Sequence, residues 1–384
     1  MSEPASGPPP SGKSRRGVAR TQPAHRGNAL SVAKPVVMPV SGRLSKQYDL
    51  FSSFFGDPNN LSNTIELYDA IPKFAVSARV QSNLRDDKGN LPVYEQEFLY
   101  RPTAPGLPKE VQCRMMVQPA SIKNPDGSYT QYYPSYDEEL VSDVLVKLFS
   151  DQQFGSHKPD GSESWVRFSL TMIQSELSAR GKTRSFDEIK RSIEILSRAV
   201  YEVRIARATK NMLYTNPILT EVTGVTRSDY LNDPKSMWVA KLPVLISKSV
   251  NEVTYRQFNY GKLMGLSSQM ARWFLKRLSH QYTQASLIDP YHILFSSIKR
   301  DSGLLHQQRI SANIKTVDAA LTELVEADVL MNFKKEDRRH GLKILDVIYT
   351  MLPTHAFRDE IKTANARQTK HRIEYRAESS PSLE

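Results

Sequence analysis

The sequence contains almost no cysteine and no long apolar run. Cys113 is the single cysteine among 384 residues, which excludes an internal disulfide and a zinc site built from several cysteines. No stretch of about 18 apolar residues occurs, so we expect no transmembrane helix. The polar, proline-rich start has no apolar signal core. We therefore expect a soluble, cytoplasmic protein with no membrane partner.

Motifs of the common enzyme classes are missing as well. The eight histidines include no His-x-His pair, and neither His-Glu-x-x-His nor Gly-x-Ser-x-Gly occurs. No cluster of carboxylates stands out as a metal site. We predict a protein that is not an enzyme, with no catalytic residue, no metal and no cofactor. A nicking enzyme with an atypical site is the alternative from another class.

Acidic residues are outnumbered, because 52 Lys and Arg face 41 Asp and Glu, a formal charge of +11. Much of this excess lies in residues 1–46, which hold eight basic residues and one acid. Such a charged, proline-rich segment cannot bury a core, so we expect a disordered basic tail over residues 1–45. It would raise affinity for DNA or RNA without reading sequence; a solubilising leader is the alternative.

A short aromatic segment, residues 46–60, follows the tail. It contains Gln47-Tyr48-Asp49-Leu50-Phe51. An exposed Leu-Phe pair beside a Gln suits an extended peptide that docks into an apolar pocket. The alternative is that these side chains pack back onto a domain as a satellite core, and spacing alone does not decide between the two.

The middle of the chain predicts a first domain over residues 131–262, after a linker with N-terminal strands over 61–130. Apolar periodicity and turn residues define its elements. They are a helix over 137–150, a strand over 165–170, a short helix over 171–179, a helix that opens with the Ser185–Glu188 capping box, and an antiparallel sheet that runs to about residue 260.

The same order returns in residues 263–355. The expected elements are a helix over 266–281 with Arg272, Lys276 and Arg277 on its exposed face, a strand over 285–288, a helix from Asp289-Pro290 to about Arg300, a helix over 309–327, and strands over 329–333 and 342–349 joined by the loop 334–341. Helix, strand, helix, helix, hairpin is the order of a winged helix. The predicted fold class is α+β, with two tandem winged-helix domains and a polar C-terminal tail over 356–384.

The second and third helices of a winged helix form a helix-turn-helix, which reads base edges with the start of the third helix and holds phosphates with nearby cations. Arg can read guanine, and Gln or Asn can read adenine. In the second domain the candidates are Lys299, Arg300, Gln307, Gln308, Arg309, Asn313, Lys315 and, on the wing, Lys334, Lys335, Arg338 and Arg339. In the first domain they are Arg180, Lys182, Arg184, Lys190 and Arg191. The alternatives are a solvated helix start, a solvated wing turn, and a first domain used for self-association.

The order of two winged-helix domains resembles that of iteron-binding plasmid replication initiators, and the sequence is similar to the TrfA type. The likeness covers roughly residues 45–350. It includes Leu140–Phe149, Phe168–Leu170, Lys182–Val203, and Gly265–Phe274, which looks like the opening of the second domain in that type.

This resemblance implies a function. Monomers would bind iterons, the repeated double-stranded DNA sites of a plasmid origin, help to open an AT-rich segment, and recruit the host initiator DnaA and the helicase DnaB. A homodimer, formed through the first domain, would be the inactive form, a means of copy control. The alternative is a tandem winged-helix transcriptional regulator or autorepressor without a replication role.

The resemblance also bears on the aromatic segment. TrfA-type initiators carry a Gln-Leu-Ser-Leu-Phe-like peptide at the corresponding place, which binds the beta sliding clamp. It makes Gln47, Leu50 and Phe51 the clamp anchors here, with Tyr48 in the place of an aliphatic residue. The DNA target, the number of repeats, the host and the working oligomer do not follow from the sequence.

Overall fold

The computed structural model describes residues 61–102, 108–151, 153–158, 162–206, 211–224, 237–341 and 343–379. The predictions made for the basic tail and for the clamp-binding peptide lie outside these residues.

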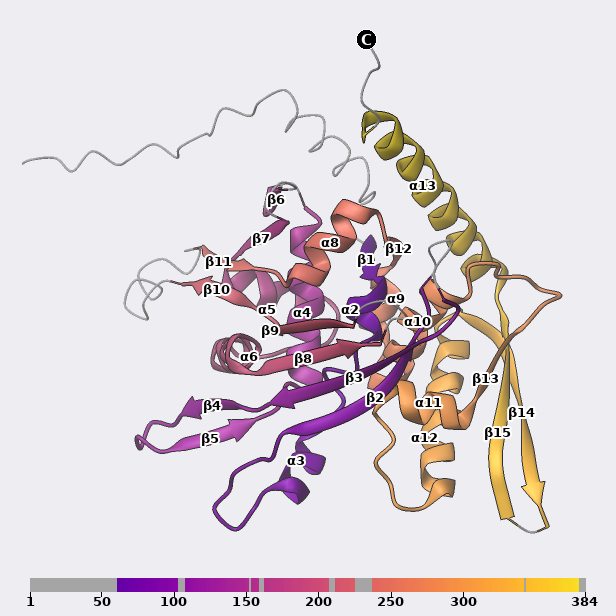
Figure 1. Ribbon diagram of the computed structural model, residues 1–384, viewed down its shortest axis with the longest axis horizontal. Coiled ribbons are helices and arrows are strands. Elements are labelled where there is room, and N and C mark those ends of the chain that lie inside the picture. The colour runs from indigo at the N-terminus through magenta and orange to yellow at the C-terminus, as the bar shows by residue number, and fades with distance from the viewer. Residues whose placement is uncertain are drawn as a thin grey trace, which may run out of the picture.

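Helices and strands alternate through the described chain (Figure 1). The helices are α2 (Glu66–Ala70), α3 (Ala78–Leu84), α4 (Tyr136–Phe149), α5 (Leu170–Ala179), α6 (Phe186–Arg198), α8 (Val244–Glu252), α9 (Tyr260–Gly265), α10 (Gln269–Gln281), α11 (Phe295–Ser302), α12 (Ile310–Glu326) and α13 (His355–Ser379). The strands are β1 (Leu61–Ile65), β2 (Tyr94–Tyr100), β3 (Val111–Gln118), β4 (Ala120–Lys123), β5 (Tyr129–Tyr132), β6 (Gly155–Lys158), β7 (Glu163–Phe168), β8 (Val200–Ile205), β9 (Met212–Pro217), β10 (Thr220–Thr223), β11 (Trp238–Lys241), β12 (Tyr255–Asn259), β13 (Tyr291–Leu294), β14 (Leu330–His340) and β15 (Lys343–Pro353). We call β1 to β12 the N-terminal half and α9 to α13 the C-terminal half.

In the N-terminal half, the helices α4, α5 and α6 pack with two four-stranded antiparallel sheets. The sheets have the orders β2-β3-β8-β9 and β10-β11-β7-β6. One apolar cluster connects Leu140 and Val144 of α4 with Phe168 of β7, Ile193 of α6 and Val203 of β8. The predicted helices and the strand over 165–170 are present, and β7 pairs with β11 rather than with the hairpin β8–β9 that follows α6. The region expected to be all sheet also contains α8.

The C-terminal half has the predicted order of helix, strand, helix, helix and hairpin, with β13 added to the hairpin in the sheet β13-β15-β14. The strand expected over 285–288 is wrong. These residues form a turn that the hydroxyl of Tyr282 holds, because it donates to the carbonyls of Ser286 and Asp289, at 2.9 and 2.5 Å. Asp289-Pro290 therefore precedes the strand β13 instead of capping a helix, and α11 begins at Phe295.

The wing is longer than predicted. Residues 334–340, expected in a loop, belong to β14, which pairs with β15 from Leu330 to His340. The turn is at Gly341, with a φ of +59°. Charged side chains disfavour strands on propensity alone, but along an exposed edge they keep the strand from pairing with other chains.

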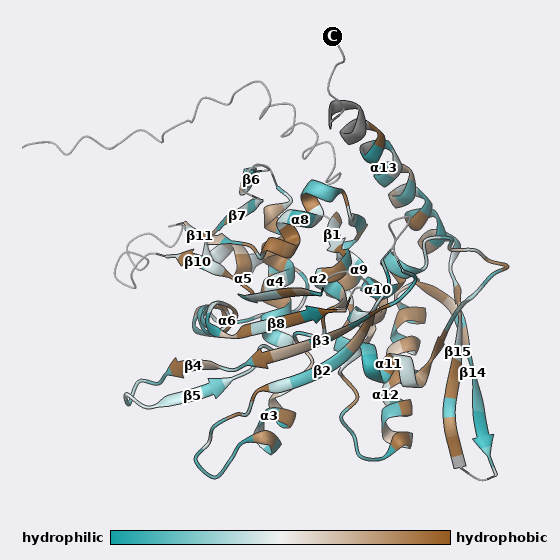
Figure 2. Ribbon diagram, viewed as in Figure 1, coloured by the Kyte–Doolittle hydropathy of each residue, from teal (hydrophilic) through white to brown (hydrophobic). Residues whose placement is uncertain are grey.

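Residues 356–384 were expected only as a polar tail, and most of them form the helix α13. Its first turns bury Phe357 and Ile361 in the core of the C-terminal half. Gln368 then donates to the carbonyls of Val253 and Tyr255, at 3.2 and 3.1 Å, next to β12. Figure 1 shows the rest of α13 projecting from the body, and Figure 2 shows much of that helix as hydrophilic.

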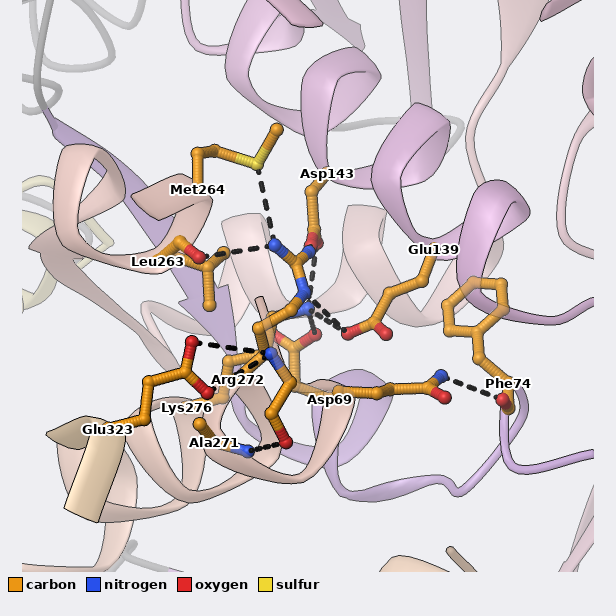
Figure 3. A network of polar contacts seen from close by, with 12 residues as sticks. Asp69, Phe74, Glu139, Asp143, Leu263, Met264, Ala271, Arg272, Lys276 and Glu323 are labelled. Atoms are coloured by element: carbon orange, nitrogen blue, oxygen red, sulfur yellow. Dashed lines mark hydrogen bonds and ion pairs between the residues drawn. The ribbon is translucent and has the colours of Figure 1, made fainter. Parts of the chain in front are cut away.

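The two halves meet through buried charges, drawn in Figure 3. The side chains of Arg272 and Lys276 were predicted to be exposed, but they are only 0% and 10% exposed. Arg272 pairs with Asp143 and Glu139 of α4, and Lys276 lies 2.7 Å from Asp143, 3.6 Å from Glu139 and 3.6 Å from Asp69 of α2. The polar face of α10 is thus not a solvent face, because it packs against the carboxylates of the N-terminal half. Arg277, predicted to be exposed, has a side chain that is only 10% exposed and lies 3.1 Å from Asp301.

A second set of contacts fixes the turn between α11 and α12. His306 Nε2 lies 3.0 Å from the carbonyl of Ala75, and the amide of Leu99 donates to Asp301 Oδ1 at 3.0 Å. Gly303 has a φ of +64°, and a Cβ there would lie 2.9 Å from the Cβ of Ala75. The turn therefore rests directly on the N-terminal half.

His280 of α10 should make the folded protein sensitive to acid. Its ring is buried, and neither ring nitrogen has a hydrogen-bond partner among the described residues. Burial, with a smaller effect of Arg256, lowers the pKa of His280 to about 3. Below about pH 6.5 the unfolded chain binds a proton at this histidine that the folded chain does not. The free energy of unfolding therefore decreases by about 1.4 kcal/mol for each pH unit of acidification.

We expect His280→Leu to remove this sensitivity. Between pH 7.5 and 5, wild type should lose about 2 kcal/mol more unfolding free energy than the variant, measured by urea denaturation. Other titrating groups are common to both proteins and cancel. Equal losses in the two proteins would contradict the assignment.

Candidate nucleic-acid interface

The outer face of α12 is open to solvent. Its inner face packs Ile314, Val317 and Leu321 into the core of the C-terminal half, which is the amphipathic pattern that made it recognisable in the sequence. The outward side chains are Ser311, Lys315, Thr316, Ala319 and Thr322. Since α11 and α12 are the second and third helices of this half, α12 stands in the place of a recognition helix.

The start of α12 favours an anion. Gln307, Gln308 and Arg309 are exposed, and the N-cap residue Arg309 makes no side-chain cap. The first turn also contains no acid. Amide N–H groups and the positive end of the helix dipole are therefore left for a ligand, an arrangement that suits phosphate.

Asn313 was predicted from the sequence to contact DNA, and the structure gives it another role. It is buried, its Oδ1 accepts from the amide of Gln307 at 3.0 Å, and its Nδ2 donates to the carbonyl of Gln307 at 2.8 Å. Both ends of the amide are thus used to close the turn before α12. Asn313 is not placed to read a base, and it instead shapes the segment that carries Gln308 and Arg309.

The wing is attached to α12 through one carboxylate. Asp318 of α12 pairs with Lys335 of β14 and accepts from the hydroxyl of Tyr349 of β15, at 3.0 Å. Asp318 was not a candidate from sequence, because nothing local to it marks a partner on a hairpin. It holds β14 beside the exposed face of α12.

The four wing cations divide between two faces of β14. Lys335 and Arg339 alternate with Lys334 and Arg338 along the strand. Lys335 pairs with Asp318 and Arg339 with Asp337. Lys334 and Arg338 are exposed, and no ion pair to either is found in the described part of the chain. The unpaired cations of the wing among the described residues are thus Lys334 and Arg338, and the exposed carboxylate of Glu336 lies between them on the same face of β14.

The end of α11 contributes little. Lys299 is exposed. Arg300 lies 2.7 Å from Asp301, and its carbonyl accepts from Gln96 of β2 at 2.9 Å. Arg300 therefore belongs to the contact between the halves rather than to the open face of α12.

The corresponding helix of the N-terminal half differs at its start. The capping box of α6 is present, since Ser185 Oγ accepts from the amide of Glu188 and Glu188 reaches back to Ser185. Asp187 and Glu188 in the first turn add negative charge. Both effects leave the start of α6 unsuited to a phosphate.

Two of the cations predicted for the first domain have carboxylate partners within the molecule, and a third is partly buried. Arg184 bonds to Asp137 at 2.5 Å, and Arg180 lies 3.5 Å from Glu176 and faces the ring of Tyr260. Burial lowers the pKa of Lys182, and repulsion from the positive charge of Arg272 in the C-terminal half lowers it further. Arg180 and Arg184 thus have carboxylate partners within the chain, and DNA contact by these three cations stays a prediction. Lys190 is half-buried, and Arg191 is exposed, 4.3 Å from the ring of Tyr132.

The described residues contain no group of three or more His, Cys, Asp or Glu side chains that could hold a metal ion. Within the same residues, no helix is both long and apolar enough to span a bilayer. The thiol of Cys113 is buried.

Comparison with known proteins gives distant structural similarities only. No family model and no curated protein matches the sequence. Two crystal structures of RctB domains 2 and 3 are similar, both at 9% identity. One covers 67% of this chain and 91% of that chain with a TM-score of 0.40, and the other covers 75% and 100% with 0.39. The Pi initiator protein in complex with iteron DNA is similar over 78% of this chain and 99% of that chain, at 9% identity and a TM-score of 0.33.

Proposed function

We propose that the protein binds a specific double-stranded DNA sequence through a winged helix in its C-terminal half. The observation that carries this proposal is the exposed, uncapped start of α12, with Gln308 and Arg309 and no acid in its first turn. The wing beside it presents Lys334 and Arg338. Side chains that read bases and cations that hold phosphates thus stand on adjoining elements, as helix-turn-helix recognition requires.

We further propose that this DNA is a set of iterons at a plasmid origin and that the protein initiates replication there. The resemblance of the sequence to TrfA-type initiators supports this role. The proposed role includes opening of the origin, recruitment of DnaA and DnaB, binding of the beta sliding clamp, and an inactive homodimer. The protein would use two tandem winged-helix domains, have no cofactor and cleave no DNA. A transcriptional autorepressor without a replication role is the competing proposal.

Selection from a random duplex library with the full chain tests the binding proposal. We expect one enriched sequence, present as direct repeats of about 20 base pairs, two helical turns, in the DNA that flanks this reading frame. No enrichment would overturn it. Maintenance of a plasmid that carries those repeats and lacks its own initiator then distinguishes an initiator from an autorepressor. Only an initiator, supplied separately, would keep such a plasmid in the cell. We expect supercoiled plasmid to stay intact when it is incubated with the protein and magnesium. Nicking of the plasmid would refute the non-enzymatic role.

The clamp proposal rests on Leu50 and Phe51. Their double replacement by alanine should weaken binding to the beta sliding clamp at least tenfold, since two apolar anchors supply most of the contact of such a peptide. Surface-immobilised clamp gives the affinity. Phe54→Ala with Phe55→Ala is the matched control and should bind like wild type. Equal affinity of wild type and the Leu50, Phe51 variant would refute the assignment.

A further inference from the structure

A second hairpin, β4–β5, is mounted on the outer side of α6. Ala120 and Ile122 of β4 pack against Ile195 and Ala199 at the end of α6 in a small apolar cluster of their own. Tyr132 of β5 lies at its edge. The hairpin is therefore held at a fixed position relative to α6, and it covers part of the helix face that a recognition helix would expose.

Two arginines flank the ring of Tyr132. Arg191 of α6 lies 4.3 Å from the ring centre, and Arg85, just after α3, lies 5.6 Å from it. Arg85 also donates to the carbonyls of Gly89 and Gln131, at 2.7 and 2.5 Å, and Arg198 donates to the carbonyl of Ser121 at 3.3 Å. We call Arg85, Lys123, Tyr129, Tyr132, Arg191 and Arg198 the Tyr132 surface.

The arginines of this surface are held in place by uncharged groups, namely backbone carbonyls and the ring of Tyr132. By contrast, Arg101 pairs with Glu110, Arg204 with Glu202 and Arg358 with Asp359. Within the described residues, no ion pair is found for Arg85, Arg191, Arg198 or Lys123. Asp187 and Glu194 share a face of α6 with Arg191 but do not pair with it. Positioned guanidinium groups that keep their charge suit an anionic ligand.

The tip of the hairpin is polar and ordered by its own side chains. Asn124 Nδ2 donates to Ser128 Oγ and Thr130 Oγ1, at 2.9 and 2.8 Å. Asp126 accepts from the amide and the hydroxyl of Ser128, which lower the pKa of its carboxyl. Lys123 and Tyr129 are exposed on either side of the turn. Hydroxyl, amide and basic side chains of this kind supply most protein contacts to the DNA backbone.

We propose that the Tyr132 surface binds the phosphate backbone of the same duplex that α12 reads, with Arg191 and Arg198 on two phosphates. The inference rests on the proposed DNA binding and adds a contact made by the β4–β5 hairpin together with the outer side of α6. In Figure 1 the hairpin β4–β5 points to the left side of the molecule and the hairpin β14–β15 to its lower right, with α12 between them in the view. The contacts that fix the turn before α12 on the N-terminal half keep this arrangement rigid. The acidic start of α6 would then stay out of the groove.

The test is the salt dependence of binding to the selected sequence in a long duplex. Arg191→Ala with Arg198→Ala should reduce the slope of log affinity against log salt by about 2, since each phosphate contact contributes about 0.9. Between 50 and 200 mM salt this difference amounts to about tenfold in affinity. Arg191→Lys with Arg198→Lys should restore most of the slope, because it restores the charge.

Arg101→Ala with Arg358→Ala is the matched control, because it removes the same charge from arginines that already have carboxylate partners. It should leave the slope unchanged. An unaltered slope in the Arg191, Arg198 alanine variant would overturn the proposal, as would an equal reduction in the control. Failure of wild type to select any sequence would instead overturn the proposed function. Circular dichroism confirms that each variant is folded.

Discussion

Replacing Arg272 with methionine should lower the free energy of unfolding by about 3–5 kcal/mol. The guanidinium is fully buried between α10 and α4, where it pairs with Asp143 and Glu139. Its Nη1 also donates to the carbonyl of Leu263, at 3.2 Å. Removing the cation leaves two carboxylates in the interior with Lys276 as their remaining partner. Urea denaturation of the full chain measures the loss.

An exposed pair supplies the control for this expectation. Arg101→Met breaks the pair with Glu110, whose side chains are 31% and 46% exposed, and should cost less than about 1 kcal/mol. Combining Arg272→Met with Asp143→Leu should recover part of the loss, because it removes a charge along with its partner. A loss below 1 kcal/mol for Arg272→Met alone would mean that solvent reaches the cluster.

The case of Arg272 explains which features the sequence could not predict. A helix with Arg272, Lys276 and Arg277 along one face has the pattern of a solvent face, and the helix itself was predicted correctly. The carboxylates that pair with Arg272 and Lys276 come from α2 and α4, more than 100 residues earlier in the chain, and the one that pairs with Arg277 comes from α11. Periodicity identifies an amphipathic helix, but it does not distinguish water from a distant charged partner.

Some features set within a few residues were predicted correctly, although the helix expected to open at Asp289-Pro290 was not. Ser185 and Glu188 form their capping box as expected, because both partners lie in one helical turn. The wing was misjudged because the length of β14 depends on its pairing with β15, whereas charged residues in isolation favour a loop. At the candidate site, Gln307, Gln308, Arg309 and Lys315 are exposed as DNA contacts require, and Asn313 is not. DNA contact by the exposed residues stays a prediction.

Arg309→Ala should weaken binding to the selected sequence by about 1–3 kcal/mol and relax the preference at one base pair. Arg309 is the N-cap of α12, exposed, without an ion pair among the described residues and without an acid in the turn that follows. An arginine so placed can approach guanine with two parallel donors, a geometry that alanine cannot replace. Affinities for the selected duplex and its single-base-pair variants measure both effects.

Lys334→Ala should behave differently and is the matched comparison. Lys334 lies on the wing face opposite the Lys335–Asp318 pair, where we expect it to contact a phosphate rather than a base edge. Its loss should weaken all sequences alike and reduce the salt slope by about 1. Lys335→Ala should weaken binding further, because it leaves Asp318 uncompensated beside the DNA and frees the hairpin from α12. If Arg309→Ala and Lys334→Ala changed affinity in the same way across the variant duplexes, the assignment of base reading to α12 and of phosphate binding to β14 would be wrong.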